Sequence, residues 1–292
     1  MMMFENLIPV STWDEPNLAV YTKLTEAQLF HYQPQHPGLF IAESPKVIER
    51  AIRAGYEPVS MLVEASVLDR DLSELATEIQ ANATGTTVDW AKLPIYVAPT
   101  ELLQSLKGYN LLRGALAVFR RQERLTVADF IQGLPSEHPR LAVLEHVVNP
   151  ANVGAIFRSA AALGIDGVLI TSDSSDPLYR RSSRASMGGV FQVPWTYVDA
   201  ETWEANGIAM LHDLGYQTAA LALRHDTISI GDPQLGQVDR LAIILGSEGP
   251  GLRATTIEQS DYTIKIPMQV GVDSLNVAAA SAVAFWELGK RP

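Results

Sequence analysis

The sequence predicts an α/β protein whose second half forms a mainly parallel sheet flanked by helices. Residues 140–171 follow the order strand, Asn/Gly-containing loop, helix and strand, which is one βαβ unit. Residues 241–245 are a near-continuous apolar run, typical of a central parallel strand that is covered on both faces. Residues 264–266 form a short apolar strand that Pro267 ends, and a glycine-containing loop leads from it to a helix over 277–288.

The first half of the chain is predicted to be a smaller α/β unit. Residues 1–30 begin irregularly and become amphipathic towards their end. Ser44 and Pro45 are a helix cap and a first helical residue, and Gly55 ends that helix. The expected strands are 38–43, 59–63, 94–97 and 115–119, and the expected helices are 46–54, 66 or 69 to 80, and 101–106.

A polar segment between about residues 124 and 140 predicts the domain boundary. It contains Gly133, Pro135 and Pro139. We therefore divide the chain into an N-terminal domain over 1–124, a linker over 125–139 and a C-terminal domain over 140–292.

Three polar loops of the C-terminal domain are expected to form one ligand site. Its expected strands are 140–145, 167–171, 217–222, 241–245 and 264–266, and its expected helices include 155–163 and 277–288. Ligands of open parallel sheets bind beyond the carboxyl ends of the strands. The loops 149–154, 246–251 and 267–276 follow three such ends.

Composition indicates a globular protein and excludes several classes of function. Of the 292 residues 47% are hydrophobic and 19% charged, and no apolar run approaches the roughly 18 residues of a membrane span. The absence of cysteine excludes disulfides, thiolate metal sites and cysteine nucleophiles. The six histidines lack metal-ligand spacing, so we expect no metal. The first residues lack the pattern of a secretory signal, so we expect a cytoplasmic location.

The charges give two opposite indications about nucleic acid. A net charge of −11 argues against a protein that coats nucleic acid non-specifically. Seven arginines nevertheless cluster in two segments, which either converge into a phosphate-binding face or are scattered over a solvated surface. They are Arg113, Arg120, Arg121 and Arg124 in the first segment and Arg180, Arg181 and Arg184 in the second.

The glycine loop at 246–251 does not match the common nucleotide motifs. It has no lysine, and Glu248 would place a negative charge where a phosphate would bind. The spacing of Gly246, Gly249 and Gly251 differs from that of a dinucleotide fingerprint. A carboxylate in this loop suits ribose hydroxyls, an amine, or the capping of backbone amides.

Polar residues at two helix starts leave a functional and a structural interpretation open. Arg158 interrupts an apolar helix, where it needs an anion or a carboxylate unless it lies on the solvent edge. Asn152 either belongs to a site or caps that helix. Ser274 and Asn276 are likewise either site residues or the ordinary cap of helix 277–288.

Three segments together resemble the signature motifs of one family. They are Asn152 to Ala160 (NVGAIFRSA), Ile244 to Leu252 (ILGSEGPGL), and Ile266 to Met268 with Ser274 to Ala278 (IPM and SLNVA). In order and spacing they are similar to the three motifs of the SpoU (TrmH-like) branch of the SPOUT RNA methyltransferases, over residues 140–292. Residues 38–124 more loosely resemble the ribosomal-protein-L30e-like substrate-binding domain that precedes the catalytic domain in many ribosomal-RNA members.

The resemblance implies methyl transfer from S-adenosylmethionine to a ribose 2′-hydroxyl of RNA. It also implies a deep trefoil knot around the cofactor, a rare exception to unknotted topology, and a homodimer formed through the C-terminal domain. We expect ribosomal RNA as the substrate because of the N-terminal domain. The alternatives are a tRNA methyltransferase, a resistance-type ribosomal-RNA methyltransferase, and a non-catalytic RNA-binding or assembly protein. A nicotinamide or nucleotide enzyme is disfavoured because its fingerprints are missing.

The resemblance also implies a role for each motif residue. The implied catalytic residues are Arg158, Ser274, Asn276, Asn152 and Glu248, and the implied cofactor contacts are Leu245, Gly246, Glu248, Gly249, Ile266, Met268, Ser274 and Leu275. The candidate RNA contacts are Arg113, Arg120, Arg121, Arg184 and Ser186. Because a guanidinium is effectively always protonated, we expect Arg158 to position a phosphate and stabilise the developing alkoxide rather than to act as the base. Ser274 would align the hydroxyl.

Overall fold

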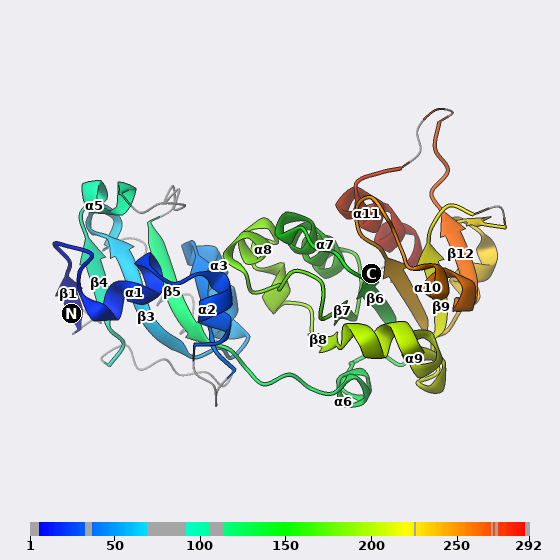
Figure 1. The fold of residues 1–292 in the computed structure, drawn as a ribbon, viewed down its shortest axis with the longest axis horizontal. Coiled ribbons are helices and arrows are strands. Elements are labelled where there is room, and N and C mark those ends of the chain that lie inside the picture. The colour runs from blue at the N-terminus through cyan, green and yellow to red at the C-terminus, as the bar shows by residue number, and fades with distance from the viewer. Residues whose placement is uncertain are drawn as a thin grey trace. The chain divides into compact units, whose positions relative to one another are not determined.

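The computed structural model describes residues 6–32, 37–68, 92–105, 114–224, 226–269, 271 and 274–289. The chain divides into two compact units, each built on its own sheet (Figure 1). The first unit comprises residues 1–123 and 178–191, and the second comprises 124–177 and 192–292. The chain thus leaves the first unit close to the predicted boundary, but a later segment returns to it.

The first unit contains a mixed sheet with the strand order β1-β4-β3-β5-β2 among the described residues. β1, β4 and β3 are parallel, and β5 is antiparallel to both of its neighbours. Its core brings Leu18, Leu29 and Leu103 against Leu62 and Val118 of the sheet. The elements are β1 Leu7–Pro9, α1 Ala19–Thr22, α2 Glu26–Phe30, β2 Leu39–Glu43, α3 Pro45–Arg53, β3 Pro58–Glu64, β4 Ile95–Ala98, α5 Thr100–Gln104 and β5 Ala115–Arg120.

The strands and two of the helices expected in this half are confirmed within one or two residues. β1 was not predicted, because three residues with Pro9 among them carry no strand pattern. Most of the helix expected from 66 or 69 to 80 lies outside the described residues.

The segment 178–191 packs in the first unit, although the sequence places it inside the C-terminal domain. It contains α8 (Arg180–Ala185) and a 3-10 turn at Gly189–Phe191. The Phe191 ring lies 5.8 Å from that of Phe40 and 5.4 Å from that of Tyr56. Arg50 Nη1 also donates a 2.7 Å hydrogen bond to the Met187 carbonyl. The first unit is therefore assembled from two separate stretches of chain.

The second unit contains an all-parallel sheet with the strand order β10-β12-β9-β11-β6-β7-β8 among the described residues. Every residue of β11 is buried, and β11 lies between β9 and β6, which confirms the predicted central strand. The strands are β6 Arg140–Leu144, β7 Gly167–Thr171, β8 Trp195–Val198, β9 Gln217–Leu221, β10 Ile228–Ser229, β11 Leu241–Leu245 and β12 Tyr262–Lys265. The knot implied by the resemblance stays a prediction.

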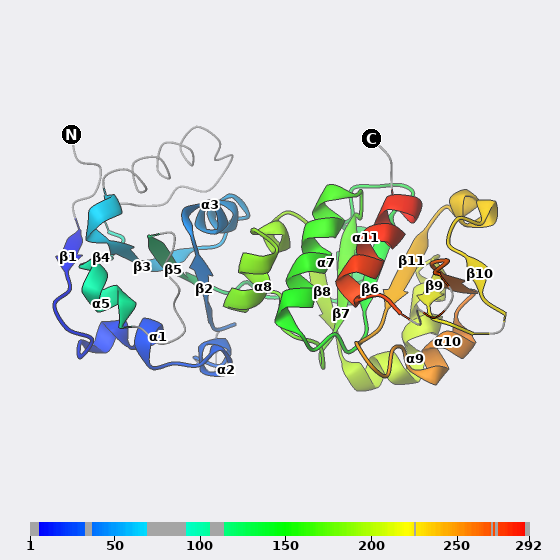
Figure 2. The same ribbon diagram turned by 90° about the horizontal axis from the view of Figure 1, so that it is seen from above.

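Helices cover both faces of this parallel sheet. They are α6 Val127–Gln132, α7 Pro150–Ala162, α9 Ala200–Asp213, α10 Ala254–Gln259 and α11 Val277–Leu288. α7 and α11 pack side by side on one face, as Figure 2 shows. On the other face, Phe130 and Ile131 of α6 share a core with Trp203 of α9. Since α6 lies within residues 125–139, this segment is part of the second unit's core and not the linker that the sequence suggested.

α7 begins at Pro150, five residues earlier than expected. The Asn149 side chain accepts a 3.0 Å hydrogen bond from the Ala151 amide, and Pro150 occupies the first helical position. Asn149 is thus the cap. Asn152 lies in the first turn, so its side chain is available for other partners.

Candidate active site

The three predicted loops meet at the carboxyl ends of β6, β11 and β12. Asn152 Nδ2 donates a 2.7 Å hydrogen bond to Glu248 Oε1. Asn276 Nδ2 donates to the same oxygen and, at 3.3 Å, to Asn152 Oδ1. Each of these residues comes from a different motif, so the structure joins the three motifs through one polar cluster. We call Asn152, Glu248 and Asn276 the amide–carboxylate cluster.

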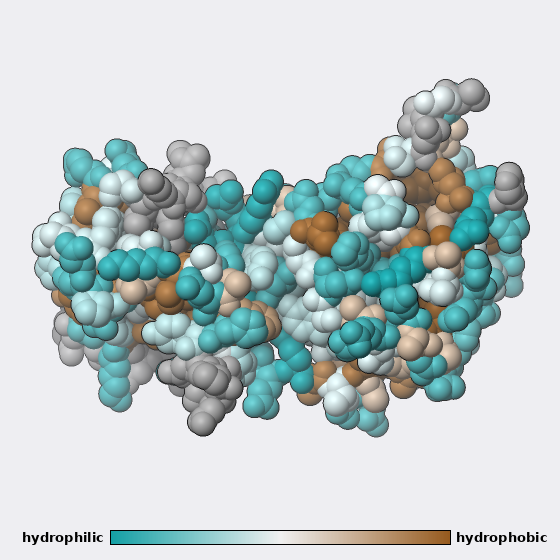
Figure 3. Space-filling view, in the orientation of Figure 1, coloured by the Kyte–Doolittle hydropathy of each residue, from teal (hydrophilic) through white to brown (hydrophobic). Residues whose placement is uncertain are grey.

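A cavity of about 740 Å³ opens beside this cluster, between β12, the 246–251 loop and α11. The residues expected to contact a cofactor all line it: Leu245, Gly246, Glu248, Gly249, Ile266, Met268, Ser274 and Leu275. The cavity is also lined by Asn276, Val277 and Ala280, which lie at or near the start of α11. Figure 3 shows hydrophobic residues at the surface between α11 and β12, where these lining residues lie. The cavity therefore combines apolar walls with a few polar groups, as small-molecule sites do.

The glycine loop folds back on itself to shape this cavity. Ser247 and Gly251 form an antiparallel bridge across the loop. A Cβ at Gly246 would lie 2.5 Å from the carbonyl carbon of Gly251, so no other residue fits there without moving the backbone. The Ser247 hydroxyl is buried and has no hydrogen-bond partner among the described residues. A bound ligand could satisfy this hydroxyl.

Arg158 is exposed on α7 and does not line the cavity. It lies six residues after Asn152, which is about 9 Å along the helix axis. Its side chain forms no hydrogen bond or ion pair with the described residues, so the solvent-edge position left open by the sequence is the one observed. An exposed guanidinium in this position is free to contact a phosphate of a bound polymer.

Several of the arginine and serine candidates for RNA contact lie in the first unit. Arg120 is exposed and pairs with Glu57 at 3.3 Å. Arg184 is half exposed and pairs with the buried Glu43 at 3.1 Å. Both guanidinium groups can still reach solvent. Arg113 lies outside the described residues.

Two other residues expected to contact RNA, Arg121 and Ser186, are buried. Arg121 is only 7% exposed, donates to the Leu39 carbonyl at 3.0 Å and lies over the Phe30 ring. Ser186 is 1% exposed and donates to the Ser183 carbonyl at 2.7 Å. Both side chains hold the fold of the first unit, so neither is available to a ligand in this conformation.

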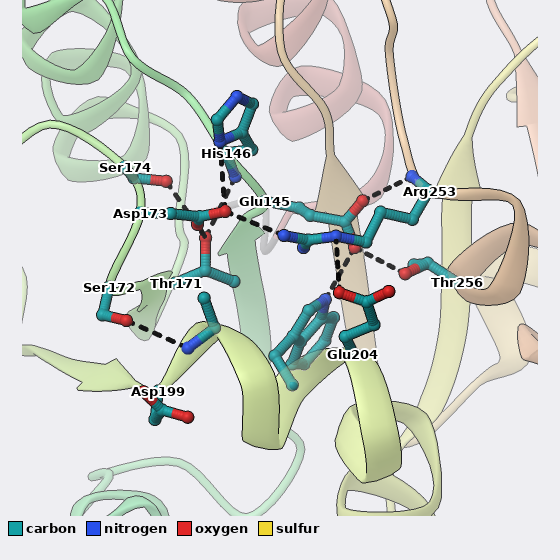
Figure 4. A network of polar contacts seen from close by, with 12 residues as sticks. Glu145, His146, Thr171, Ser172, Asp173, Ser174, Asp199, Glu204, Arg253 and Thr256 are labelled. Carbon is teal, nitrogen blue, oxygen red and sulfur yellow. Dashed lines mark hydrogen bonds and ion pairs between the residues drawn. The ribbon is translucent and has the colours of Figure 1, made fainter.

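A buried polar network beyond the ends of β6 and β7 was not predicted (Figure 4). Glu145, directly after β6, is completely buried and accepts hydrogen bonds from Trp203, Thr256 and the Arg253 backbone. Asp173, after β7, accepts from Thr171 and from Arg253 Nη2. The only sequence signal was an acidic residue at the end of an apolar strand.

The network shifts the titration of Asp173. Burial opposes ionisation, but hydrogen bonds from Thr171 and Arg253, together with the positive charge of Arg253, outweigh it and lower the pKa of Asp173. The carboxylate is thus held in its charged form beside the guanidinium.

Neither a metal site nor a membrane span is found in the part of the chain that the structure describes. No group of three His, Asp or Glu side chains there could hold a metal ion. No helix there has the length and apolar character needed to cross a membrane.

Comparisons with known proteins give a consistent picture. The model of the SpoU rRNA Methylase family matches residues 139–286. An uncharacterised tRNA/rRNA methyltransferase of Mycobacterium bovis is 33% identical over 94% of this chain and 88% of its own length. The 23S rRNA (guanosine-2′-O-)-methyltransferase RlmB of Yersinia pestis is 31% identical over 75% of this chain and 84% of its own. The crystal structure of an AdoMet-bound rRNA methyltransferase from Sinorhizobium meliloti has a TM-score of 0.77 over 97% of both chains and, at 20% identity, shares the fold.

Proposed function

We propose that this chain, which belongs to the SpoU rRNA methylase family, transfers a methyl group from S-adenosylmethionine to a ribose 2′-hydroxyl of ribosomal RNA. The observation that carries the proposal is the amide–carboxylate cluster at the edge of the cavity. The Yersinia pestis relative is a 23S rRNA (guanosine-2′-O-)-methyltransferase, which supports both the methylated atom and the class of RNA.

The cavity fits S-adenosylmethionine in size and in chemistry. Its 740 Å³ lies within the roughly 300–1,000 Å³ of small-molecule sites. Leu245, Ile266 and Leu275 offer apolar surface for an adenine ring, and Glu248 offers an acceptor for ribose hydroxyls or an amine. The unpartnered Ser247 hydroxyl offers a further polar contact. When bound there, the cofactor supplies an electrophilic methyl group on a positively charged sulfur.

Arg158 and Ser274 would bind and orient the RNA. A ribose hydroxyl is a weak nucleophile at neutral pH, so it must be aligned with the methyl–sulfur bond and its developing charge must be stabilised. Arg158 is exposed and unpaired among the described residues, so it can hold the adjacent phosphate and stabilise the alkoxide. Ser274 lies at the exposed rim of the cavity, where its hydroxyl can orient the ribose. The amide–carboxylate cluster joins α7, which carries Arg158, to the 246–251 loop and to the start of α11, which follows Ser274.

Substitution of Arg158 tests the proposed reaction. Because Arg158 lies outside the cavity, Arg158→Ala and Arg158→Lys should bind S-adenosylmethionine with unchanged affinity in calorimetry. Both should lose methyl transfer to a ribosomal RNA fragment by about a hundredfold or more, since neither restores a planar guanidinium. Undiminished turnover by Arg158→Lys would contradict the role given to Arg158. Failure of the wild type to bind S-adenosylmethionine would contradict the function itself.

The class of RNA needs a separate test. The experiment maps 2′-O-methylated nucleotides in ribosomal RNA and tRNA from two strains, one that produces this protein and one that lacks it. We expect one ribosomal nucleotide to lose its methyl group. Loss from a tRNA would favour the tRNA alternative, which the name of the Mycobacterium relative also includes.

The first unit would bind the RNA substrate in the manner of the L30e-like domain that its sequence resembles. Arg120 and Arg184 are its exposed candidate contacts, and Arg113 is a further candidate outside the described residues. The second unit would form the homodimer. RNA as substrate agrees with a cytoplasmic location.

A further inference from the structure

Glu145 contacts both ends of the loop that forms one wall of the cavity. Its backbone N–H donates a 2.9 Å hydrogen bond to the Leu245 carbonyl, where the loop begins. Its carboxylate accepts a 2.6 Å hydrogen bond from the Arg253 backbone N–H, where the loop ends and α10 starts. One residue of the neighbouring strand end thus fixes the start and the finish of the segment 245–253.

The Glu145 carboxylate is itself held firmly. It is completely buried, and its other oxygen accepts hydrogen bonds from Trp203 Nε1 at 2.6 Å and from the Thr256 hydroxyl. Trp203 belongs to α9 and Thr256 to α10. Figure 4 shows Thr256 directed towards Glu145, and the Arg253 side chain directed towards Asp173 and Glu204. A buried carboxylate with every contact satisfied has little freedom to move.

The segment between the two Glu145 contacts supplies much of the cavity wall. Its residues from Leu245 to Leu252 line the cavity without a gap, and Ala254 and Ile257 of α10 extend that wall. Because Gly246 and Gly251 approach each other closely, the backbone of this loop has little room to move. A change in the distance between its ends would therefore alter the cavity directly.

We propose that Glu145 is a positioning residue that sets the geometry of the cofactor loop and thereby the affinity for S-adenosylmethionine. Glu145 does not line the cavity, so it would not touch a cofactor bound there. The inference rests on the proposed function, because it takes the cavity to be the cofactor site. It assigns a role in binding to a residue outside all three sequence motifs.

Glu145→Gln is the first test. The glutamine side chain has the same size but only one acceptor oxygen. Either the Arg253 N–H or the Trp203 N–H therefore faces the NH₂ group of the amide, which cannot accept its hydrogen bond. If the loop end is released, affinity for S-adenosylmethionine in calorimetry should fall roughly tenfold. The KM for the cofactor should rise equally while kcat at saturating cofactor stays within about twofold, because Arg158 and Ser274 are unchanged.

A second pair of variants separates positioning from folding. Arg253 has φ −59°, which proline can adopt, so Arg253→Pro removes the backbone donor to Glu145. Arg253→Ala keeps that donor and loses the same side chain, so it is the matched control. Arg253→Pro should reproduce the loss of cofactor affinity seen in Glu145→Gln, and Arg253→Ala should bind like the wild type.

Trp203→Phe and Thr256→Val complete the set. Each removes a donor to the Glu145 carboxylate but leaves the hydrogen bond from the Arg253 N–H in place, so each should lower the melting temperature and reduce cofactor affinity much less than Glu145→Gln does. Wild-type affinity in folded Glu145→Gln and Arg253→Pro would overturn the inference. An equal loss of affinity in Trp203→Phe and Thr256→Val would overturn it too, since Glu145 would then act through stability alone. Failure of the wild type to bind S-adenosylmethionine would instead overturn the proposed function.

Discussion

The two polar side-chain atoms of Asn276 make different kinds of contact. Its Oδ1 accepts a 2.9 Å hydrogen bond from the Ala278 amide and so caps α11. Its Nδ2 donates to Glu248 and to Asn152. The cap, which the sequence leaves as one of two alternatives, is therefore confirmed, and the same amide also joins the amide–carboxylate cluster.

Two substitutions of Asn276 should separate these purposes. Asn276→Ala removes the cap and should lower the free energy of unfolding by about 1 kcal/mol. Asn276→Asp keeps a capping oxygen at a helix N-terminus but replaces the donor with a charge beside Glu248. It should retain most of the stability and weaken S-adenosylmethionine binding by roughly tenfold. Denaturant unfolding and calorimetry measure the two effects. Equal unfolding free energies would contradict the cap, and unchanged affinity in Asn276→Asp would contradict the bridge to Glu248.

For single residues, the sequence indicated candidate site residues where a residue type is unusual for its surroundings. Glu248 in a glycine loop and Arg158 in an apolar helix stood out because each conflicts with its neighbours. Arg121 and Ser186 were misjudged because their partners, the Phe30 ring and the Ser183 carbonyl, are set by tertiary packing. Glu145 was overlooked for the same reason: its donors come from residues 58 to 111 positions away.

At the scale of elements, Asp261 joins the starts of β9 and β12. Its Oδ2 accepts hydrogen bonds from the Thr218 amide at 2.7 Å, from the Thr218 hydroxyl at 2.8 Å, and contacts His212 Nε2 at 2.9 Å. Burial opposes its ionisation, but the Thr218 hydrogen bonds and His212 outweigh burial and lower the pKa of Asp261. The strand that leads to the third motif is therefore anchored by a charged group.

The Asp261 anchor should make the free energy of unfolding depend on pH in a defined direction. Because the pKa of Asp261 is lower in the folded than in the unfolded state, its contribution is complete above about pH 3.9 and is lost as the pH falls through the folded value. Asp261→Asn should melt roughly 2–4 °C below the wild type at pH 6, with the difference shrinking below pH 4. Asp239→Asn, at an exposed surface pair, is the control and should change little. A pH-independent difference for Asp261→Asn would contradict the ionic anchor.

Elements with strong patterns were predicted well, and short or composite ones were not. α11 has the bounds expected from its cap and apolar run, and β11 is the buried central strand. β10 has two residues, too few for any periodicity. α6 was taken for a linker because its polar surroundings conceal Phe130 and Ile131, whose burial depends on the rest of the unit. The return of residues 178–191 to the first unit is likewise decided by distant partners such as Phe40 and Tyr56.

At the scale of the whole molecule, α11 presents a second apolar face away from its own unit. Ala280, Ala284, Phe285 and Leu288 are buried, whereas Ala279, Val283 and Trp286 are exposed. The exposed positions are spaced by four and three residues, so they form one stripe along the helix. Trp286 is 66% and Val283 40% exposed, an arrangement that is typical of an interface between proteins. We propose this stripe as the contact surface of the homodimer suggested above for the second unit.

If this stripe forms the proposed homodimer, a charge placed in it should dissociate that dimer. Trp286→Glu removes an aromatic anchor and places a carboxylate in an apolar interface, which should weaken association by about 2 kcal/mol or more, or roughly thirtyfold. Trp286 lies at the C-terminal part of α11, away from the cap, so the fold should persist. Leu125→Glu is the matched control, because Leu125 is 58% exposed and lies outside α11, in the segment before α6. Sedimentation velocity should show a monomer for Trp286→Glu and a wild-type dimer for Leu125→Glu. A dimer that survives Trp286→Glu, or one that only Leu125→Glu dissociates, would move the interface away from α11.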